Sequence, residues 1–461
     1  MSPCIRKFPY RPDSSRFFEI LVGRAWPVFL DSGRPASTSG RYDILTADPR
    51  VTLVTRGDLT EIRDAQGVRS SRADPFALLD ATLGPQQPRI PGLPFRGGAI
   101  GYFAYDLARR LERLPSVAED AEGIPDMAVG IYDWALVVDH ARCRSRLVAQ
   151  DPACLDEVFG RLIRALSGPA PATGVFRILA PVRSNLSRTQ YLSALERIRH
   201  YLYEGDCYQV NFAQRFDAPA QGDAWQAYKG LRRLNPAPFA AYLATPDCRI
   251  LCTSPERFLR VRGDRVETKP IKGTRPRGSH PVEDRMLAES LRRSPKDRAE
   301  NLMIVDLLRN DLGKVCAIGS VHVPTLFEVE SYMRVHHLVS TVRGRLAAGR
   351  NAVDLLRACF PGGSITGAPK LRAMEIIEEL EPHRRGVYCG AIGYLGYDGA
   401  MDTNIVIRTL VHSAGVIRLW AGGGIVADSD PEAEYRETYD KAAPLLELLE
   451  QLRRRETEIP D

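Results

Sequence analysis

The residue with the most distinctive chemistry is a lysine inside a basic stretch. Lys272 lies in KPIKGTRPRG, which spans residues 269–278 and contains no acidic residue. A lysine amine is a nucleophile only when it is neutral, and burial or nearby cations such as Lys269, Arg275 and Arg277 would lower its pKa towards that state. A solvated basic loop, a loop that binds nucleic acid and a pocket for an acidic metabolite are the alternatives that the stretch alone leaves open.

Two pairs of carboxylates occur at helical spacing. Asp297 and Glu300 lie three residues apart in one segment, and Glu434 and Glu437 repeat the spacing near the C-terminus. Residues three apart share a helical face, and two such faces together would offer the hard oxygen ligands that suit Mg²⁺. The helix dipole also favours carboxylates near helix N-termini, so surface charge explains each pair taken singly.

Several segments could bind an anion. The glycine-rich segments PGGSITGAPK (361–370) and AGGGIVADSDP (421–431) offer backbone N–H groups, each ahead of a predicted helix. His337, Tyr388 and Arg408 stand among apolar residues. An arginine in apolar surroundings needs a carboxylate from either the core or a ligand. Together with the acidic pairs, these residues predict a metal-dependent site for a small polyanion.

The elements that must position these residues are strands and helices in irregular order. Regular βαβ alternation is absent, so we predict an α+β fold with mostly antiparallel sheets. Asp430 can cap the last helix and Pro431 can occupy its first turn. A linker, SGPAPATG, separates an N-terminal region (1–166) from a C-terminal region (175–456). Runs before the linker that predict strands are RVTLVTRG, GGAIGYFAYD and VGIYDWALVVDH. After it, TQYLSALERIRHYLYEG predicts a helix, and CRILCTS and RFLRVRGDRVET predict strands.

The composition is that of a globular protein. The chain has 461 residues, 44% of them hydrophobic, and its 63 basic and 57 acidic residues give a net charge of +6. This small excess fits an anionic substrate at least as well as a nucleic acid, and the basic stretch has no aromatic residue for base stacking. The N-terminus has no apolar signal region and no run reaches membrane-spanning length, so we expect a cytoplasmic protein with nine reduced cysteines.

A series of ordered motifs resembles the chorismate-utilising enzymes. They are GDCYQVN, TSPERF, KPIKGTRPRG, KDRAENLMIVDLLRNDLG, VHHLVS, FPGGSITGAPK, RGVYCGAIGY, IRT and AGGGIVADSDPEAEYRET. N-terminal stretches such as RYDILTADP extend the resemblance to nearly the whole chain. It implies an anthranilate synthase-like fold: two mainly antiparallel sheets packed as a sandwich and surrounded by helices. It also implies one intertwined two-lobed unit, with the site between the lobes.

Two positions separate the branches of this family. Gln209 stands where isochorismate-forming members carry a lysine that activates water, so the resemblance implies ammonia as the nucleophile. Lys272 stands where anthranilate-forming members have alanine, and lysine there marks the aminodeoxychorismate branch. In that branch the lysine is thought to attack ring C2 and expel the C4 hydroxyl. Ammonia then attacks C4 and expels the lysine, which gives 4-amino-4-deoxychorismate for 4-aminobenzoate and folate biosynthesis.

The resemblance also assigns roles to individual residues. Glu256, in TSPERF, would be the general acid and base for the C4 hydroxyl. Glu300 and Glu437 would bind Mg²⁺ that holds the ring carboxylate, with Glu434 and Asp297 adjacent or acting through water; the family usually has glutamate at the last position. The remaining predicted substrate contacts are Gln209, Thr274, His337, Thr366, Tyr388, Arg408, Gly422, Gly424 and Lys441. Of these, Thr274, His337 and Thr366 would line the ring, and the last five would bind or adjoin the enolpyruvyl carboxylate.

Partners follow from what the sequence lacks. No glutaminase motif of the Gly-x-Cys-x-Gly kind is found, so ammonia is expected to be free or supplied by a separate glutamine amidotransferase subunit. A separate lyase would have to remove pyruvate to reach 4-aminobenzoate. The competing interpretations are an anthranilate synthase component I, a nucleic-acid-binding protein and a non-catalytic partner of an amidotransferase.

Overall fold

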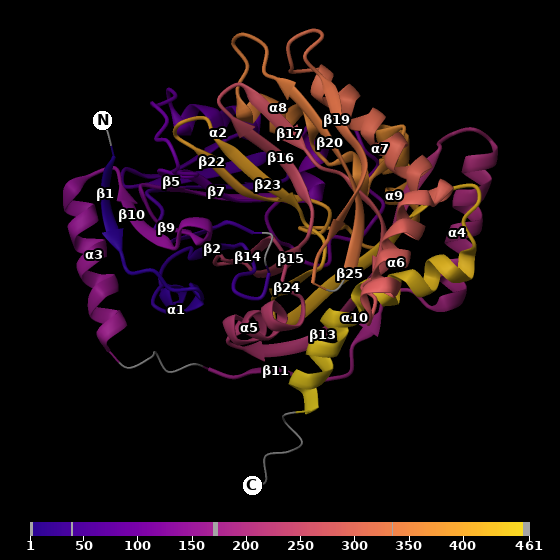
Figure 1. Ribbon diagram of the computed structural model, residues 1–461, viewed down its shortest axis with the longest axis horizontal. Coiled ribbons are helices and arrows are strands. Elements are labelled where there is room, and N and C mark those ends of the chain that lie inside the picture. Colours follow the sequence, from indigo (N-terminus) through magenta and orange to yellow (C-terminus); the bar gives the residue numbers. More distant parts are fainter. Residues whose placement is uncertain (1–2, 38–39, 169–173, 334, 455–461) are drawn as a thin grey trace.

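Two large sheets pack face to face in the computed structural model, which describes residues 3–37, 40–168, 174–333 and 335–454 (Figure 1). The first sheet has 13 strands, and each strand pairing in it is antiparallel among the described residues. In order across it they are β1 (Cys4–Phe8), β10 (Arg144–Ala149), β9 (Trp134–Asp139), β3 (Tyr42–Thr46), β2 (Val28–Asp31), β14 (Phe239–Ala244), β15 (Arg249–Ser254), β24 (Thr409–Ser413), β25 (Val416–Ile425), β13 (Gln209–Gly222) and β11 (Phe176–Ile178). Two short strands, β12 (Arg183–Ser184) and β21 (Gly367–Ala368), also pair with β13.

The second sheet has 12 strands and ends at the strand that carries Lys272. Its order is β18 (Ile271–Pro276), β20 (Val335–Arg345), β17 (Arg265–Thr268), β16 (Arg257–Arg262), β23 (Met401–Ile405), β22 (Ala391–Gly396), β7 (Gly98–Phe103), β8 (Met127–Tyr132), β4 (Val51–Arg56), β5 (Leu59–Asp64) and β6 (Gly67–Ser71), with β19 (His322–Ser331) also on β20.

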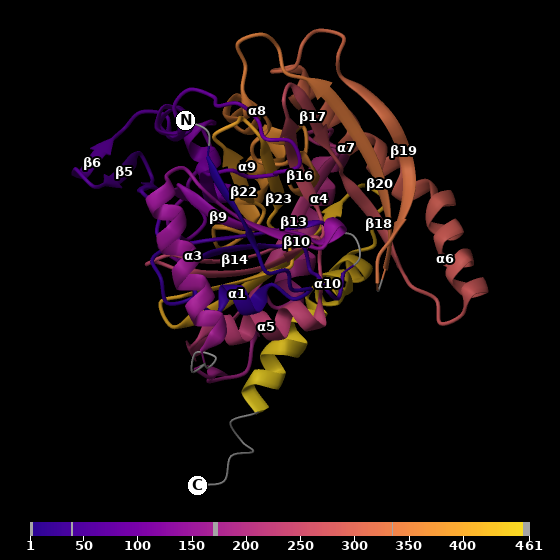
Figure 2. The same cartoon turned by 60° about the vertical axis from the view of Figure 1, so that its left-hand side comes forward.

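Helices cover the outer surfaces of this sandwich, and Figure 2 shows α3 along one side and α6 projecting on the other. The α-helices are α1 (Ser15–Phe18), α2 (Pro75–Leu83), α3 (Pro152–Ser167), α4 (Arg188–Tyr203), α5 (Ala224–Leu234), α6 (Pro281–Arg293), α7 (Pro295–Gly313), α8 (Ala352–Cys359), α9 (Lys370–Leu380) and α10 (Pro431–Arg454). The 3₁₀ helices are η1 (Tyr105–Arg110), η2 (His140–Arg142) and η3 (Gly363–Ile365). The predicted pair of antiparallel sheets surrounded by helices is confirmed.

Both halves of the sequence contribute strands to both sheets. In the first sheet β2 pairs with β14, and in the second β7 pairs with β22. The predicted linker, of which residues 169–173 lie outside the described part of the chain, therefore divides the sequence without dividing either sheet.

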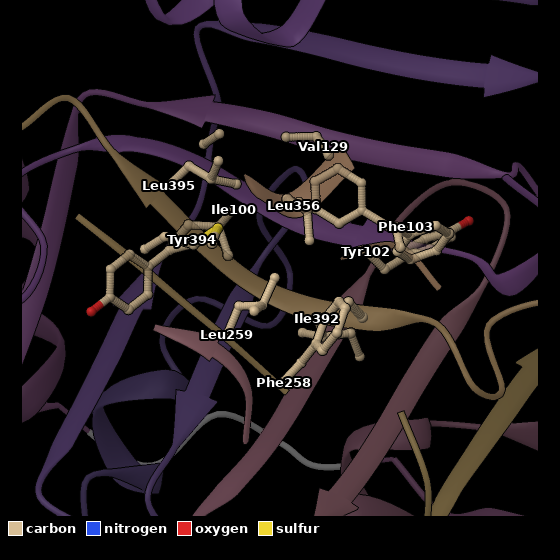
Figure 3. Close-up of a cluster of buried hydrophobic side chains, with 14 of the residues drawn as sticks. Ile100, Tyr102, Phe103, Val129, Phe258, Leu259, Leu356, Ile392, Tyr394 and Leu395 are labelled. Atoms are coloured by element: carbon tan, nitrogen blue, oxygen red, sulfur yellow. The ribbon is translucent and has the colours of Figure 1, made fainter. Parts of the chain in front are cut away.

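The largest hydrophobic core lies around the second sheet (Figure 3). All six residues of β7 are buried, so neither face of this strand meets water. Phe103 stacks on Phe76 of α2 with ring centroids 5.8 Å apart, whereas the Tyr102 hydroxyl lies 3.9 Å from Cys248 Sγ at the first sheet. Burial of each such aromatic side chain contributes roughly 1.5–3 kcal/mol, so this core stabilises the second sheet.

The sequence correctly predicts where α10 starts, but it does not indicate the strand that contains Lys272. The Asp430 side chain accepts a hydrogen bond from the backbone N–H of Ala433 at 2.8 Å, and α10 begins at Pro431, as predicted. The predicted loop around Lys272 is instead the edge strand β18. Its register on β20 shifts between Ile271 and Thr274, which marks a β-bulge. Proline and glycine are tolerated here because an edge strand has one partner only.

Two further segments singled out in the sequence have the following structure. The first five residues of the glycine-rich segment 421–431 form the end of β25. Arg408, which stands among apolar residues, lies between β23 and β24 with φ of 52°, a left-handed backbone conformation. This turn separates the two strands, which belong to different sheets, and leaves the guanidinium group on the wall of the cavity between them.

Candidate active site

A cavity of about 880 Å³ lies where β18, α7, β25 and α10 meet. Most of the residues predicted for the site line it. These are Glu256, Lys272, Thr274, Asp297, Glu300, His337, Tyr388, Arg408, Gly422, Gly424, Glu434, Glu437 and Lys441. They come from segments up to 185 positions apart, so only the tertiary fold brings them together.

Lys272 lies in the bulge of β18, and its Nζ donates a hydrogen bond to the backbone carbonyl of Ser364 at 3.2 Å. Burial lowers the pKa of the Lys272 amine; the ammonium group of Lys441 acts in the same direction, and Glu300 opposes it. Gly273 follows with φ of 79°, and a Cβ at this position would lie 2.8 Å from the Asp297 carboxylate. The bulge thus brings the amine into the cavity and its backbone close to α7.

The cations next to Lys272 in sequence are not what lowers its pKa. Each of the three is paired with a carboxylate: Lys269 with Glu330, Arg275 with Asp297 and Arg277 with Asp284. Their charge is therefore locally compensated. Burial within the cavity, which the sequence alone did not display, replaces them as the principal cause.

Glu256 is buried on the same side of the cavity. Burial raises the pKa of its carboxyl group to about 7, although the Ser364 hydroxyl and the charge of Lys272 both stabilise the carboxylate. A carboxyl group with this pKa is present in both protonation states near neutral pH. It can therefore donate a proton in one step and accept one in another.

The four predicted metal ligands face the cavity from two helices. Asp297 and Glu300 lie on α7, and Glu434 and Glu437 lie on α10. Burial raises the pKa of Glu300, and the charges of Glu434 and Asp297 raise it further. Burial likewise raises the pKa of Glu434. Bringing these carboxylates together carries an electrostatic cost that a bound cation would relieve.

Protein cations contact three of these carboxylates. Arg275 pairs with Asp297, Lys296 lies 3.6 Å from Glu434, and Lys441 lies 2.6 Å from Glu437. In this arrangement no three metal-binding side chains among the described residues are grouped closely enough to hold one ion. The all-oxygen donor set nevertheless fits a hard divalent cation, provided that the flexible lysines give way.

The opposite wall is built to receive an anion. Burial lowers the pKa of Arg408 to about 10, and its guanidinium group forms no ion pair with a carboxylate of the described residues. Tyr388 stacks on Trp420 with parallel rings 5.9 Å apart. Thr274 Oγ1 and His337 Nδ1 share a hydrogen bond of 2.9 Å, and burial lowers the pKa of His337 to about 4, so this imidazole is neutral.

Two predicted substrate contacts lie behind the cavity wall. Thr366 is fully buried and its hydroxyl bonds to the backbone carbonyl of Gly362 at 3.1 Å, so it supports the wall and does not line it. Gln209 is 1% exposed and lies against Gly424. Thr366 therefore does not line this cavity, and its contact with the ring stays a prediction.

Three residues that line the cavity were missed. Ser364 contacts both Lys272 and Glu256, Trp420 supports Tyr388, and Asn211 has a buried side-chain oxygen. Ser364 and Asn211 lie within motifs quoted for the family resemblance, but no local pattern distinguishes their side chains. The alternation along β13, which puts Asn211 on the same face as Gln209, was the available signal.

The chain belongs to the chorismate binding enzyme family, whose model matches residues 29–447. Aminodeoxychorismate synthase component 1 of Klebsiella aerogenes is 50% identical to it over 455 residues, which cover 98% of this chain and 100% of that protein.

Members with another activity are also similar. Anthranilate synthase component 1 of Thermus thermophilus is 45% identical over 440 residues, covering 93% of this chain and 94% of that protein. The solved structure of anthranilate synthase component I from Streptococcus pneumoniae matches with a TM-score of 0.79 at 33% identity, covering 88% of this chain and 92% of that one. Helices long and apolar enough to cross a membrane do not occur in the described part of the chain.

Proposed function

We propose that this chain converts chorismate and ammonia to 4-amino-4-deoxychorismate through a covalent adduct on Lys272. The observation that carries the proposal is a buried amine of lowered pKa in the same cavity as a carboxyl group of pKa about 7. Similarity over the full chain to aminodeoxychorismate synthase component 1 supports the same reaction.

The reaction has two displacements. In the first, neutral Lys272 bonds to ring C2, the ring double bonds shift, and the C4 hydroxyl leaves as water with a proton from Glu256. The carboxylate so formed takes a proton from the new C2–N amine. In the second, ammonia bonds to C4, the double bonds shift back, and the C2–Nζ bond breaks. Glu256 passes a proton from the incoming nitrogen to the departing lysine, which regenerates both groups.

Different residues of the cavity would bind the two carboxylates of the substrate. Arg408, Tyr388 and the strand at Gly422 and Gly424 would bind the enolpyruvyl carboxylate, with Lys441 adjacent. Mg²⁺, held by Glu300 and Glu437 with Glu434 and Asp297 nearby, would neutralise and orient the ring carboxylate. Lys441 pairs with Glu437, so its ammonium group marks where a cation is favoured.

Ammonia would come from a separate glutamine amidotransferase subunit. The numbering of the relatives as component 1 supports a second component. The product would serve 4-aminobenzoate and folate synthesis once a separate lyase removes pyruvate. A cytoplasmic location fits this role.

One assay tests the proposal against the alternative that the Thermus relative suggests, namely anthranilate formation. The chain is incubated with chorismate, Mg²⁺ and ammonium chloride without any lyase. The expected product is 4-amino-4-deoxychorismate with no pyruvate. Release of pyruvate together with anthranilate would refute the proposal.

A further inference from the structure

We propose that Asn211, together with Gln209, forms the binding site for ammonia beside Lys272. This inference rests on the proposed function and adds a residue to which neither the motifs nor the predicted contacts gave a role. It concerns the second displacement only, the one in which ammonia attacks the ring.

Both side chains have an oxygen atom without a hydrogen-bond donor. Asn211 is 8% exposed and Gln209 is 1% exposed, and Asn211 Oδ1 and Gln209 Oε1 have no partner within the described residues. A buried amide oxygen without a donor destabilises the fold, so such atoms usually face a ligand or water. Asn211 lines the cavity itself, so a reacting molecule in the cavity can supply the missing donor.

The fold places both side chains close to the nucleophile. Asn211 is directly opposite Gly424 in the antiparallel pairing of β13 with β25, and opposite residues share a face with Cβ atoms about 4.5–5.5 Å apart. A Cβ at Gly424 would lie 3.5 Å from Lys272 Nζ and would overlap Gln209 Nε2. The Gln209 amide therefore lies directly against Gly424, and Asn211 and the lysine amine lie beside the same residue.

The backbone of Asn211 is fixed on both sides. Its N–H donates to the carbonyl of Thr366 at 2.8 Å, and its carbonyl accepts from the Arg385 guanidinium at 2.7 Å. Arg385 is 1% exposed and also donates to the carbonyl of Ile365 at 2.9 Å. The same cation thus ties Asn211 to the turn that contacts Lys272 and Glu256, so the side chain is held in place before the substrate arrives.

Ammonia is the reactant whose hydrogen-bonding capacity matches two acceptors. Its three N–H groups can donate to the two amide oxygens, which leaves the lone pair free to point at ring C4. As the C4–N bond forms, positive charge develops on this nitrogen and both hydrogen bonds strengthen. The C4 hydroxyl is the other donor of the substrate, but it has left as water before this step. Carboxylates of the substrate cannot donate at all.

The test separates the two displacements. Asn211→Leu keeps the approximate size of the side chain but removes the acceptor. Without ammonia, adduct formation on Lys272 is followed by intact-protein mass spectrometry. With ammonium chloride at saturating chorismate, the KM for ammonium is measured. We expect adduct formation within twofold of wild type. For ammonium, KM should rise and kcat/KM should fall about tenfold, the effect of one lost hydrogen bond near 1.4 kcal/mol.

Asn185→Ala is the matched control. Asn185 Oδ1 accepts from the N–H of Arg215 on the same strand, β13, at 2.8 Å, and Asn185 does not line the cavity. Its removal loosens β13 without changing the proposed site, so the KM for ammonium should stay at the wild-type value. Asn211→Ala repeats the test if the leucine variant fails to fold.

Three results would overturn the inference. An unchanged KM for ammonium in both Asn211 variants would show that ammonia binds elsewhere. Equal losses in adduct formation and in ammonium use, shared by the control, would show a structural role. If wild type forms neither adduct nor 4-amino product, the proposed function fails and the ammonia site fails with it.

Discussion

Lys272 Nζ lies 3.2 Å from the backbone oxygen of Ser364 and donates a hydrogen bond to it. The hydroxyl group of Ser364 contacts the Glu256 carboxylate at the same time. One residue of the 3₁₀ turn η3 therefore fixes the distance between the proposed nucleophile and the proposed acid. This link holds together a group on β18 and a group in the turn between β15 and β16, so that both can act on one substrate.

Replacing Lys272 with alanine should change the product. We expect 4-amino-4-deoxychorismate to fall at least 100-fold and 2-amino product to appear, because ammonia can then occupy the space vacated at C2. Chromatography of reactions with chorismate, Mg²⁺ and ammonium distinguishes the two isomers. Retention of the 4-amino product at the wild-type rate would rule out the covalent route.

Replacing Glu256 with glutamine should stabilise the protein at high pH. The folded-state pKa is about 7 against an ordinary value of 4.5, so between these values the folded chain holds a proton that the unfolded chain has released. The contribution of this group to stability is complete below about pH 4.5 and is lost as pH rises through 7. Glutamine does not titrate, so the variant should exceed wild type by about 3 kcal/mol at pH 8.

Urea unfolding at pH 4.5 and pH 8 measures this difference. Glu447→Gln, at an exposed position on α10, is the control and should show no comparable gain. An equal stability of Glu256→Gln and wild type at pH 8 would mean that the carboxyl group is better solvated than its burial indicates.

Adding one methyl group at Gly424 should impair catalysis. The new Cβ would overlap Gln209 Nε2, which lies 1.8 Å from its position, and would approach Lys272 Nζ. We expect kcat/KM for ammonium to fall more than tenfold in Gly424→Ala because Gln209 must move. Steady-state kinetics measures it, and Gly313→Ala, where no atom lies within 4 Å of the added group, should behave as wild type. Normal kinetics in Gly424→Ala would show that the Gln209 amide can shift freely.

Mg²⁺ affinity should respond in opposite directions to two substitutions. Lys296→Ala removes an ammonium group 3.6 Å from Glu434 that competes with a metal, so binding should tighten several-fold. Glu300→Gln removes a proposed ligand and should weaken binding at least tenfold. Isothermal titration calorimetry with MgCl₂ measures both without any turnover. If neither substitution alters Mg²⁺ affinity, the metal is bound by other groups.

The sequence predicts what local chemistry decides. The start of α10 follows from Asp430 and Pro431, because a cap and a first-turn proline act within four residues. The acidic pairs on α7 and α10 follow from helical spacing. The branch-specific role of Lys272 came from family resemblance, whereas its burial could not be inferred from a stretch so rich in charge.

Contacts between residues far apart in the sequence could not be predicted from it. Asn211 and Ser364 are small polar residues whose importance depends on strand register and on a turn more than 90 positions away from Lys272. The strand β18 was mistaken for a loop because its glycine and prolines disfavour strands, and only its position at a sheet edge permits them.

That edge position bears on how activities diversify within such enzymes. β18 pairs with β20 alone, and its bulge already interrupts the ladder at Lys272. A side chain at this point is constrained by one neighbouring strand only, so it can be exchanged without interrupting a second strand pairing. Under the proposed function, one substitution at position 272 would therefore remove the nucleophile and leave the two sheets intact.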